Sequence, residues 1–343
     1  LSETGSVGRA FIAAHTSGFA EALKVADAFD ALTLVERTGL AQATLQEFFA
    51  LFARTDKVVT VFSQGVNQSS CGTDKVNAII NCHLATGRLG KPGATPCSVT
   101  GHPNAMGGRE GGGPANTLAA HMEIEKPEDR DRVQRFWQSP IIAEKAGLKA
   151  VDMFRAVADG RIKALWIMAT NPVVSMPDAG DVEKAIRNCP FVVVSDVIAN
   201  TDTVRHAHVR LPAAGWGEKS GTVTNSERRI SRQRCFLPLP GEARPDWWIM
   251  CQVATRMGFG AAFDYAAPSE IFAEHAALSA FENDGARDFD IGAFANICGS
   301  DFDRLEPFQW PRPIASNSRQ QLFADGNYFT PDRKARFIAV ALE

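Results

Sequence analysis

The chain has 343 residues, of which 45% are hydrophobic and 22% charged, which is typical of a folded protein with a real core. Its net charge of −3 argues against a broad surface for nucleic acid or membrane, because either surface needs an excess of Lys and Arg. No stretch approaches the ~20 consecutive apolar residues of a membrane-spanning helix.

The first 54 residues have the hydrophobic period of helices. Phe19, Leu23 and Ala26 repeat at helical spacing, and a further helix is predicted over residues 43–54. We therefore predict a helical lead-in over residues 1–54.

A strand, a polar loop and a helix follow in that order. Residues 57–63 are rich in β-branched side chains and predict a buried strand. The polar loop 64–70, which contains Gln64 and Gln68, leads to a helix predicted over residues 73–86. This order is typical of the βα unit of an open parallel sheet.

Residues 87–117 are predicted to form a long loop, because they contain nine glycines and four prolines. Loops of this length in compact domains are usually functional or disordered, and the polar residues here favour an ordered functional loop. Arg109 lies among five glycines, where a guanidinium can hold a planar oxyanion with two hydrogen bonds. The alternative is a surface ion pair with Glu110.

The alternation of helices and strands then resumes. Strands are predicted over residues 164–169 and 191–194, and their ends carry Asn171 and the pair Ser195 and Asp196. Together with the strand before Gln64, these ends are predicted to converge on one crevice that binds a phosphorylated ligand. The alternative is that these residues are ordinary caps at strand ends.

The remaining segments are less regular. The loop 215–229 is dense in hydrogen-bonding groups, and its Lys219 is either a phosphate ligand or part of a solvated turn. Helices are predicted over residues 246–257 and 269–281. We expect three parts, namely the lead-in, an α/β region over residues 55–260, and a helical and irregular extension over residues 261–343. The predicted fold class is α/β, with an open, mostly parallel, Rossmann-like sheet and flanking helices.

Several familiar sites are absent from the sequence. It has no GxGxxG stretch after a predicted strand and no GxxxxGK[ST], which disfavours an ordinary dehydrogenase or P-loop enzyme. Its seven cysteines form no CxxC pair, so we predict no metal ligands within this chain and favour a reducing compartment.

Several motifs, in the same order, resemble a known family. Residues 64–68 and 81–93 resemble the middle of the molybdopterin oxidoreductases, the DMSO-reductase superfamily. Residues 100–110 are similar to its nitrate-reductase branch, and residues 215–229 and 240–247 to its late signature. The resemblance covers roughly residues 10–340 and implies domains 1–3 of the formate dehydrogenase/DMSO reductase type of fold.

The resemblance also implies a cofactor and a reaction. The cofactor is molybdenum-bis(molybdopterin guanine dinucleotide), and its contact candidates are Gln64, Gln68, Asn171, Ser195, Asp196, Lys219 and Asp246. Arg109 matches the arginine near the metal and would orient nitrate, which loses an oxygen atom and becomes nitrite.

Other parts of the family pattern do not occur in this sequence. They are the cysteine motif of the 4Fe-4S cluster, the protein ligand of molybdenum and the C-terminal pterin-binding domain. We therefore expect an internal fragment of a cytoplasmic, assimilatory-type nitrate reductase that is inactive in isolation, and an electron-donor protein or reductase domain as its partner. The alternatives are a formate dehydrogenase-type molybdoenzyme and a non-catalytic α/β nucleotide-binding module.

Overall fold

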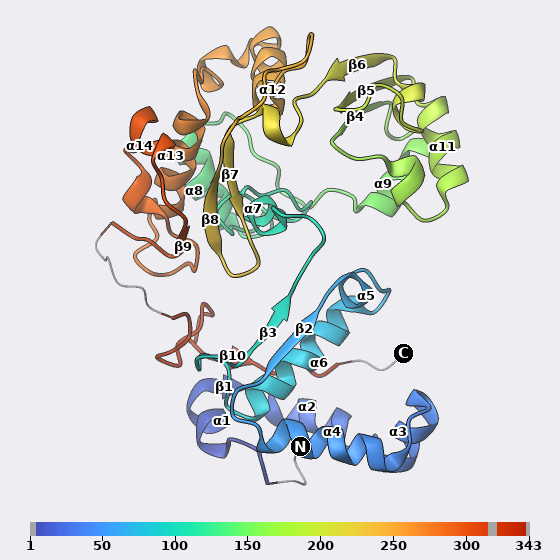
Figure 1. The fold of residues 1–343 in the computed structure, drawn as a ribbon, viewed down its shortest axis with the longest axis vertical. Coiled ribbons are helices and arrows are strands. Elements are labelled where there is room, and N and C mark those ends of the chain that lie inside the picture. Colours follow the sequence, from blue (N-terminus) through green and yellow to red (C-terminus); the bar gives the residue numbers. More distant parts are fainter. Residues whose placement is uncertain (1–4, 315–320, 341–343) are drawn as a thin grey trace. The chain divides into compact units, whose positions relative to one another are not determined.

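The computed structural model describes residues 5–314 and 321–340, which divide into two compact units (Figure 1). Unit 1 comprises Leu1–Ala105, Ala286–Asp288 and Asn317–Glu343, and unit 2 comprises Met106–Gly285 and Phe289–Ser316. Within the described ranges, no helix has both the length and the apolar character needed to cross a membrane.

Unit 1 begins with four helices, none of which contains a fully buried residue. Local sequence sets their ends: the Asp30 carboxylate accepts a hydrogen bond from the Thr33 amide at one N-terminus (2.8 Å), and Gly39 ends the same helix with a φ of 69°. The helices are α1 (Arg9–His15), α2 (Phe19–Ala26), α3 (Ala31–Thr38) and α4 (Gln42–Arg54).

Two short parallel strand pairs complete unit 1. Strand β2 (Val59–Phe62) pairs with β3 (Thr95–Ser98), and α5 (Gln64–Asn67) and α6 (Gly72–Ala85) lie between them in sequence. Strand β1 (Thr16–Ser17) pairs with β10 (Ala335–Arg336). The small core therefore joins distant parts of the sequence, since Leu84 packs with Tyr328, Ala335 and Phe337.

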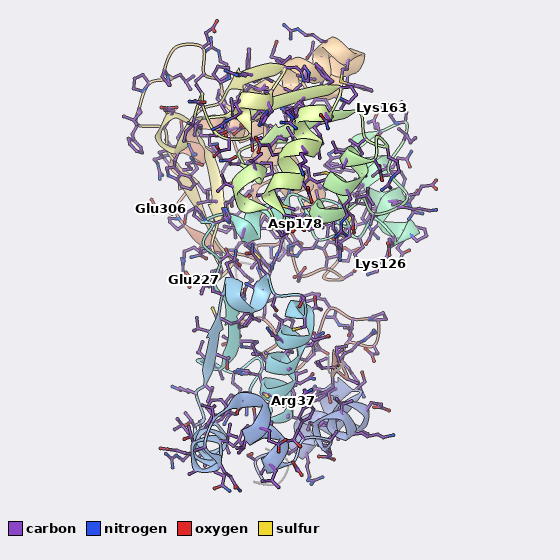
Figure 2. The ribbon with its side chains drawn as sticks, turned by 90° about the vertical axis from the view of Figure 1, so that its right-hand side faces the viewer. Arg37, Lys126, Lys163, Asp178, Glu227 and Glu306 are labelled. Carbon is purple, nitrogen blue, oxygen red and sulfur yellow. The ribbon has the colours of Figure 1, made fainter. Side chains whose placement is uncertain are left out.

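Unit 2 is built around a three-stranded parallel sheet. Its order is β4 (Ala164–Met168), β5 (Phe191–Asp196) and β6 (Val209–Pro212). Helices α9 (Ala150–Ala158) and α11 (Ala179–Asn188) pack against β4 and β5 to form a buried apolar core, and Asp178, labelled in Figure 2, is the N-cap of α11. The short α10 (Pro172–Ser175) follows β4.

A second, antiparallel sheet lies in the same unit. Its strands are β7 (Gly221–Thr224), β8 (Arg229–Gln233) and β9 (Phe308–Gln309), and Glu227, labelled in Figure 2, lies in the turn between the first two. The accompanying helices are α7 (Ala105–Glu110), α8 (Pro127–Trp137), α12 (Asp246–Ala254), α13 (Pro268–Ala280) and α14 (Gly299–Asp303).

The α/β class with parallel strands and flanking helices is confirmed, but the strands do not form the single sheet that was predicted. The long loop predicted over residues 87–117 contains β3 and α7, and the loop 215–229 contains β7. Strand β3 was not predicted because it contains Pro96. Proline is nevertheless compatible with an outer strand that has a free edge. The three-part domain division stays a prediction, and its boundaries at 54 and 260 differ from those of the two compact units.

Candidate functional site

Three candidate residues lie where β4 and β5 end in unit 2. The Asn171 Oδ1 atom accepts hydrogen bonds from the amide and the hydroxyl of Thr203 (3.2 and 2.7 Å). The buried Ser195 hydroxyl accepts from the Trp166 indole (2.9 Å), and Asp196 Oδ1 accepts from the Ile198 amide (3.1 Å). Each of these side chains is therefore fixed by neighbours at the carboxyl edge of the sheet.

Lys219 and Asp246 belong to the same edge. The ammonium of Lys219 donates to Asp246 Oδ2 at 2.9 Å, and both side chains are about one-quarter exposed. The backbone places them there: Ala213, which follows β6, bonds to Asp196 through its amide (3.0 Å) and forms a parallel bridge with Arg244, two residues before Asp246. Five predicted cofactor residues are thus brought together in unit 2.

Asp246 has an unused acceptor in this arrangement. Its Oδ1 atom is buried and has no hydrogen-bond partner within the described ranges. A buried carboxylate oxygen without a donor costs free energy, so an N–H or O–H group of a ligand or a water molecule would stabilise this atom. A guanine, with its N1–H and N2–H₂ donors, meets that need, and Lys219 beside it suits a phosphate. The residues present therefore fit a guanine nucleotide.

Arg109 and Glu110 do not form the surface pair that was considered as an alternative. The Arg109 side chain is exposed and has no hydrogen bond or ion pair with any residue that the structure describes. Glu110 is only 3% exposed, and its carboxylate accepts from Thr224 Oγ1 and Trp310 Nε1 instead. A guanidinium in that state is available to bind an anion.

Gln64 and Gln68 lie in unit 1, whereas the other candidates lie in unit 2. They flank the short α5 at the end of β2, and Gln64 is half-buried while Gln68 is exposed. Asn67, which the sequence did not single out, donates to Ser98 Oγ (2.9 Å) and links the carboxyl ends of β2 and β3. The sequence predicted that the carboxyl end of β2 converges with those of β4 and β5 on one crevice, and this stays a prediction.

Sequence reasoning also missed the residues that support the candidates. Thr203 is fully buried and holds Asn171, and Trp166 holds Ser195. Their positions offer little local signal, because Thr203 is 32 residues from Asn171 along the chain. Only the folded sheet reveals these contacts.

Comparison with known proteins identifies the family of this chain. The family described as molybdopterin oxidoreductase matches residues 10–256. A nitrate reductase of Klebsiella oxytoca is 54% identical over 84% of this chain and 33% of its own length, and one of Shewanella frigidimarina is 45% identical over 100% and 37%. The chain thus spans about a third of the length of these curated relatives.

A solved structure supports the fold. The acetylene hydratase of Pelobacter acetylenicus aligns with a TM-score of 0.68 over 98% of this chain and 46% of its own. The two sequences are only 13% identical, so the likeness concerns the fold alone.

Proposed function

Because this chain belongs to the molybdopterin oxidoreductase family, we propose that the whole protein of which it forms part reduces nitrate to nitrite. The observation that carries the proposal is Arg109: an exposed guanidinium without a partner in the described ranges, in a segment whose sequence is similar to the nitrate-reductase branch. The proposed type is assimilatory and cytoplasmic.

In the proposed reaction the cofactor and the protein chain have different roles. When bound, the molybdenum cofactor would supply the two-electron, oxygen-atom-transfer chemistry that converts nitrate to nitrite. Arg109 binds the planar anion through two N–H donors and orients the scissile N–O bond. Its positive charge also stabilises the negative charge that redistributes over the remaining oxygens.

The cofactor proposal is molybdenum held by two molybdopterin guanine dinucleotides, as the resemblance implies. In unit 2, Asp246 Oδ1 would accept from a guanine edge and Lys219 would lie near a phosphate. Asn171, Ser195 and Asp196 line the same sheet edge and would orient the nucleotide. Gln64 and Gln68 of unit 1 are the remaining cofactor-contact candidates that the resemblance implies. A 4Fe-4S cluster and the docking site of an electron-donor protein or reductase domain would lie in the rest of the protein.

The test uses the full-length protein, produced anaerobically with molybdate. We expect about one molybdenum and four irons per chain, following the cofactors that the resemblance implies, and nitrite from nitrate with reduced viologen. Arg109→Ala should lower kcat/KM for nitrate by about 100-fold or more, in the range of losing one oriented charged donor. Arg155→Ala, at an exposed arginine of α9 paired with Asp152, is the matched control and should leave the rate unchanged.

Other outcomes would reject parts of the proposal. Bound molybdenum without nitrite formation would keep the cofactor and discard the substrate, and formate oxidation would then be assayed. A folded full-length protein without molybdenum would leave only a nucleotide-binding module.

The cofactor site has a separate test. Asp246→Asn replaces one of the two acceptor oxygens by an amide that cannot accept from guanine. We expect the molybdenum content of the purified full-length protein to fall several-fold, whereas Asp152→Asn on exposed α9 should leave it unchanged. Equal metal content in both variants would contradict a role for Asp246 in holding the cofactor.

A further inference from the structure

The segment that carries Arg109 lacks intrinsic stability. Helix α7 has six residues, two of them glycine, and three more glycines follow it directly. Glycine inside a helix is destabilising relative to alanine, and a helix this short does not persist alone. Contacts with the rest of unit 2 must therefore hold it in place.

Glu110 supplies those contacts from the last position of the helix. Its Oε2 atom accepts from Thr224 Oγ1 at 2.7 Å, and its Oε1 atom accepts from Trp310 Nε1 at 2.6 Å. All three residues are only 3% exposed. Hydrogen bonds in a buried, water-poor site are stronger than those in water, so the Glu110 side chain joins α7 firmly to β7 and to the residue after β9.

The turn after Glu110 is also closely packed. The Glu110 carbonyl accepts from the Ala120 amide, and the Gly113 amide donates to the Gly108 carbonyl, both at 2.7 Å. Gly112 has a φ of 80°, and a Cβ atom there would lie 2.7 Å from the Ala119 nitrogen. Glycine is required at this position for both reasons, and the backbone on the C-terminal side of Arg109 has little freedom.

The direction of Arg109 follows from this anchoring. Successive residues of a helix point about 100° apart, so with the Glu110 side chain held inside, that of Arg109 is directed outward. The guanidinium is exposed and has no hydrogen bond or ion pair among the described residues, while its backbone is fixed by its neighbour. A charge held this way loses less conformational entropy when it binds an anion.

We infer that Glu110 is a positioning residue for Arg109: its buried carboxyl group, held by Thr224 and Trp310, fixes the end of α7 and so holds the backbone of Arg109 where its guanidinium can bind the anion. This inference rests on the proposed function, because it assigns Glu110 a part in binding the anionic substrate. Glu110 itself does not touch the substrate. The competing role is purely structural, as one more buried hydrogen-bonded group of unit 2.

A double-mutant cycle on the full-length, cofactor-loaded protein separates the two roles. Glu110→Gln keeps the shape of the side chain but replaces one acceptor oxygen by a donor. We expect kcat/KM for nitrate to fall about 10- to 100-fold, mostly through a higher KM, because the arginine loses its fixed direction. In an Arg109→Ala background the same substitution should cost less than about 2-fold, since a residue that acts only through Arg109 has nothing left to act on.

Two further variants keep the test decisive. Thr224→Val removes the hydroxyl that donates to Glu110 Oε2 and should raise KM by a smaller factor, which covers the case in which Glu110→Gln does not fold. Ser279→Ala removes a buried hydroxyl of α13 that accepts from the Ile291 amide, so it should lower the melting temperature comparably without changing KM. If Ser279→Ala and Glu110→Gln change KM equally, or if the Glu110→Gln loss persists in full without Arg109, the inference is overturned.

Amide hydrogen exchange gives a readout that does not depend on the reaction. In Glu110→Gln, amides of residues 107–113 should exchange at least about 10-fold faster, while those of α13 should not change. Failure of the proposed function would appear in the parent protein as absence of nitrite, whereas unaltered exchange at 107–113 would overturn the positioning role alone.

Discussion

The helices that cover β4 and β5 in unit 2 differ from the first helices of unit 1 in what lies against their apolar faces. On α11, Val182, Ala185 and Ile186 are at most 6% exposed against the parallel sheet. On α2, α3 and α4 no residue is buried, and Phe48 is 58% exposed. Amphipathic spacing therefore predicts that a helix has an apolar face, but the sheet decides whether that face is closed.

The two regions also differ in how they are held. In unit 2 the core is apolar and continuous. In unit 1 a polar group, Arg88, contributes much of the attachment of α4: it is 5% exposed, donates to the carbonyls of Phe52, Ala53 and Thr55, and lies 4.8 Å from the Phe52 ring centroid. These bonds cap the C-terminal end of α4. Mutations in the core of unit 2 should therefore destabilise it by leaving cavities. Mutation of Arg88 in unit 1 should destabilise α4 by removing hydrogen bonds.

The largest effect is expected from a cavity in unit 2. Ile186 is fully buried, so Ile186→Ala should lower the free energy of unfolding by about 2–5 kcal/mol. All six tryptophans lie within unit 2, so tryptophan fluorescence during urea unfolding reports on that unit specifically. A loss below about 1 kcal/mol would mean that this core is not closed as described.

Acid should weaken unit 2 through His275 on α13. Burial, with a smaller contribution from His121, lowers the pKa of His275 from 6.5 to about 4, and its ring lies against Phe289. The folded state then binds its proton more weakly than the unfolded state, so stability is full above pH 6.5 and is lost as the pH falls toward 4. Each pKa unit corresponds to about 1.4 kcal/mol, which limits the loss to about 3 kcal/mol.

The control for this pH dependence is His275→Gln, which cannot titrate. Unfolding free energies of both proteins would be measured by urea titration from pH 7 to pH 4. The difference between them should shrink or reverse in acid, and a constant difference would contradict the lowered pKa.

In unit 1, Arg88→Met should destabilise α4 without opening a large cavity. It keeps the apolar stem but removes the donors to three carbonyls, and losing hydrogen bonds from a buried charged group costs about 1.5–3 kcal/mol. Hydrogen exchange should accelerate for α4 and leave α11 unchanged. Arg37→Met, at an exposed arginine of α3, should change neither helix.

The smallest effect is expected on the open face of unit 1. Phe48→Ser removes a large side chain that is more than half exposed, and such surface changes alter stability by less than about 0.5 kcal/mol. Differential scanning calorimetry would check this. A loss as large as that of Ile186→Ala would mean that another part of the protein covers this face.

Sequence reasoning identified the helices and strands that have a clear hydrophobic pattern. It missed those that form only through pairing with another part of the chain. The strands at β4 and β5 were predicted to within a few residues because they are continuous apolar runs, and the polar residues at their ends do lie at one edge. Strand β7 was missed because Gly221–Thr224 has no pattern of its own and exists through pairing with β8. A surface pair of Glu110 with Arg109 stayed open as an alternative, since nothing local reveals Trp310, which is 200 residues away.

The parallel pairing of Thr16 with Ala335 has a consequence for the order in which the protein folds during synthesis. Leu84 leaves the ribosome well before Tyr328 and Phe337, which complete its core and emerge only after nearly all of unit 2. Because domains fold as units while the chain grows, unit 2 can finish first and the N-terminal helices must wait. Throughout that interval the apolar faces of these helices are exposed to solvent, which makes this segment of the nascent chain a natural client of chaperones.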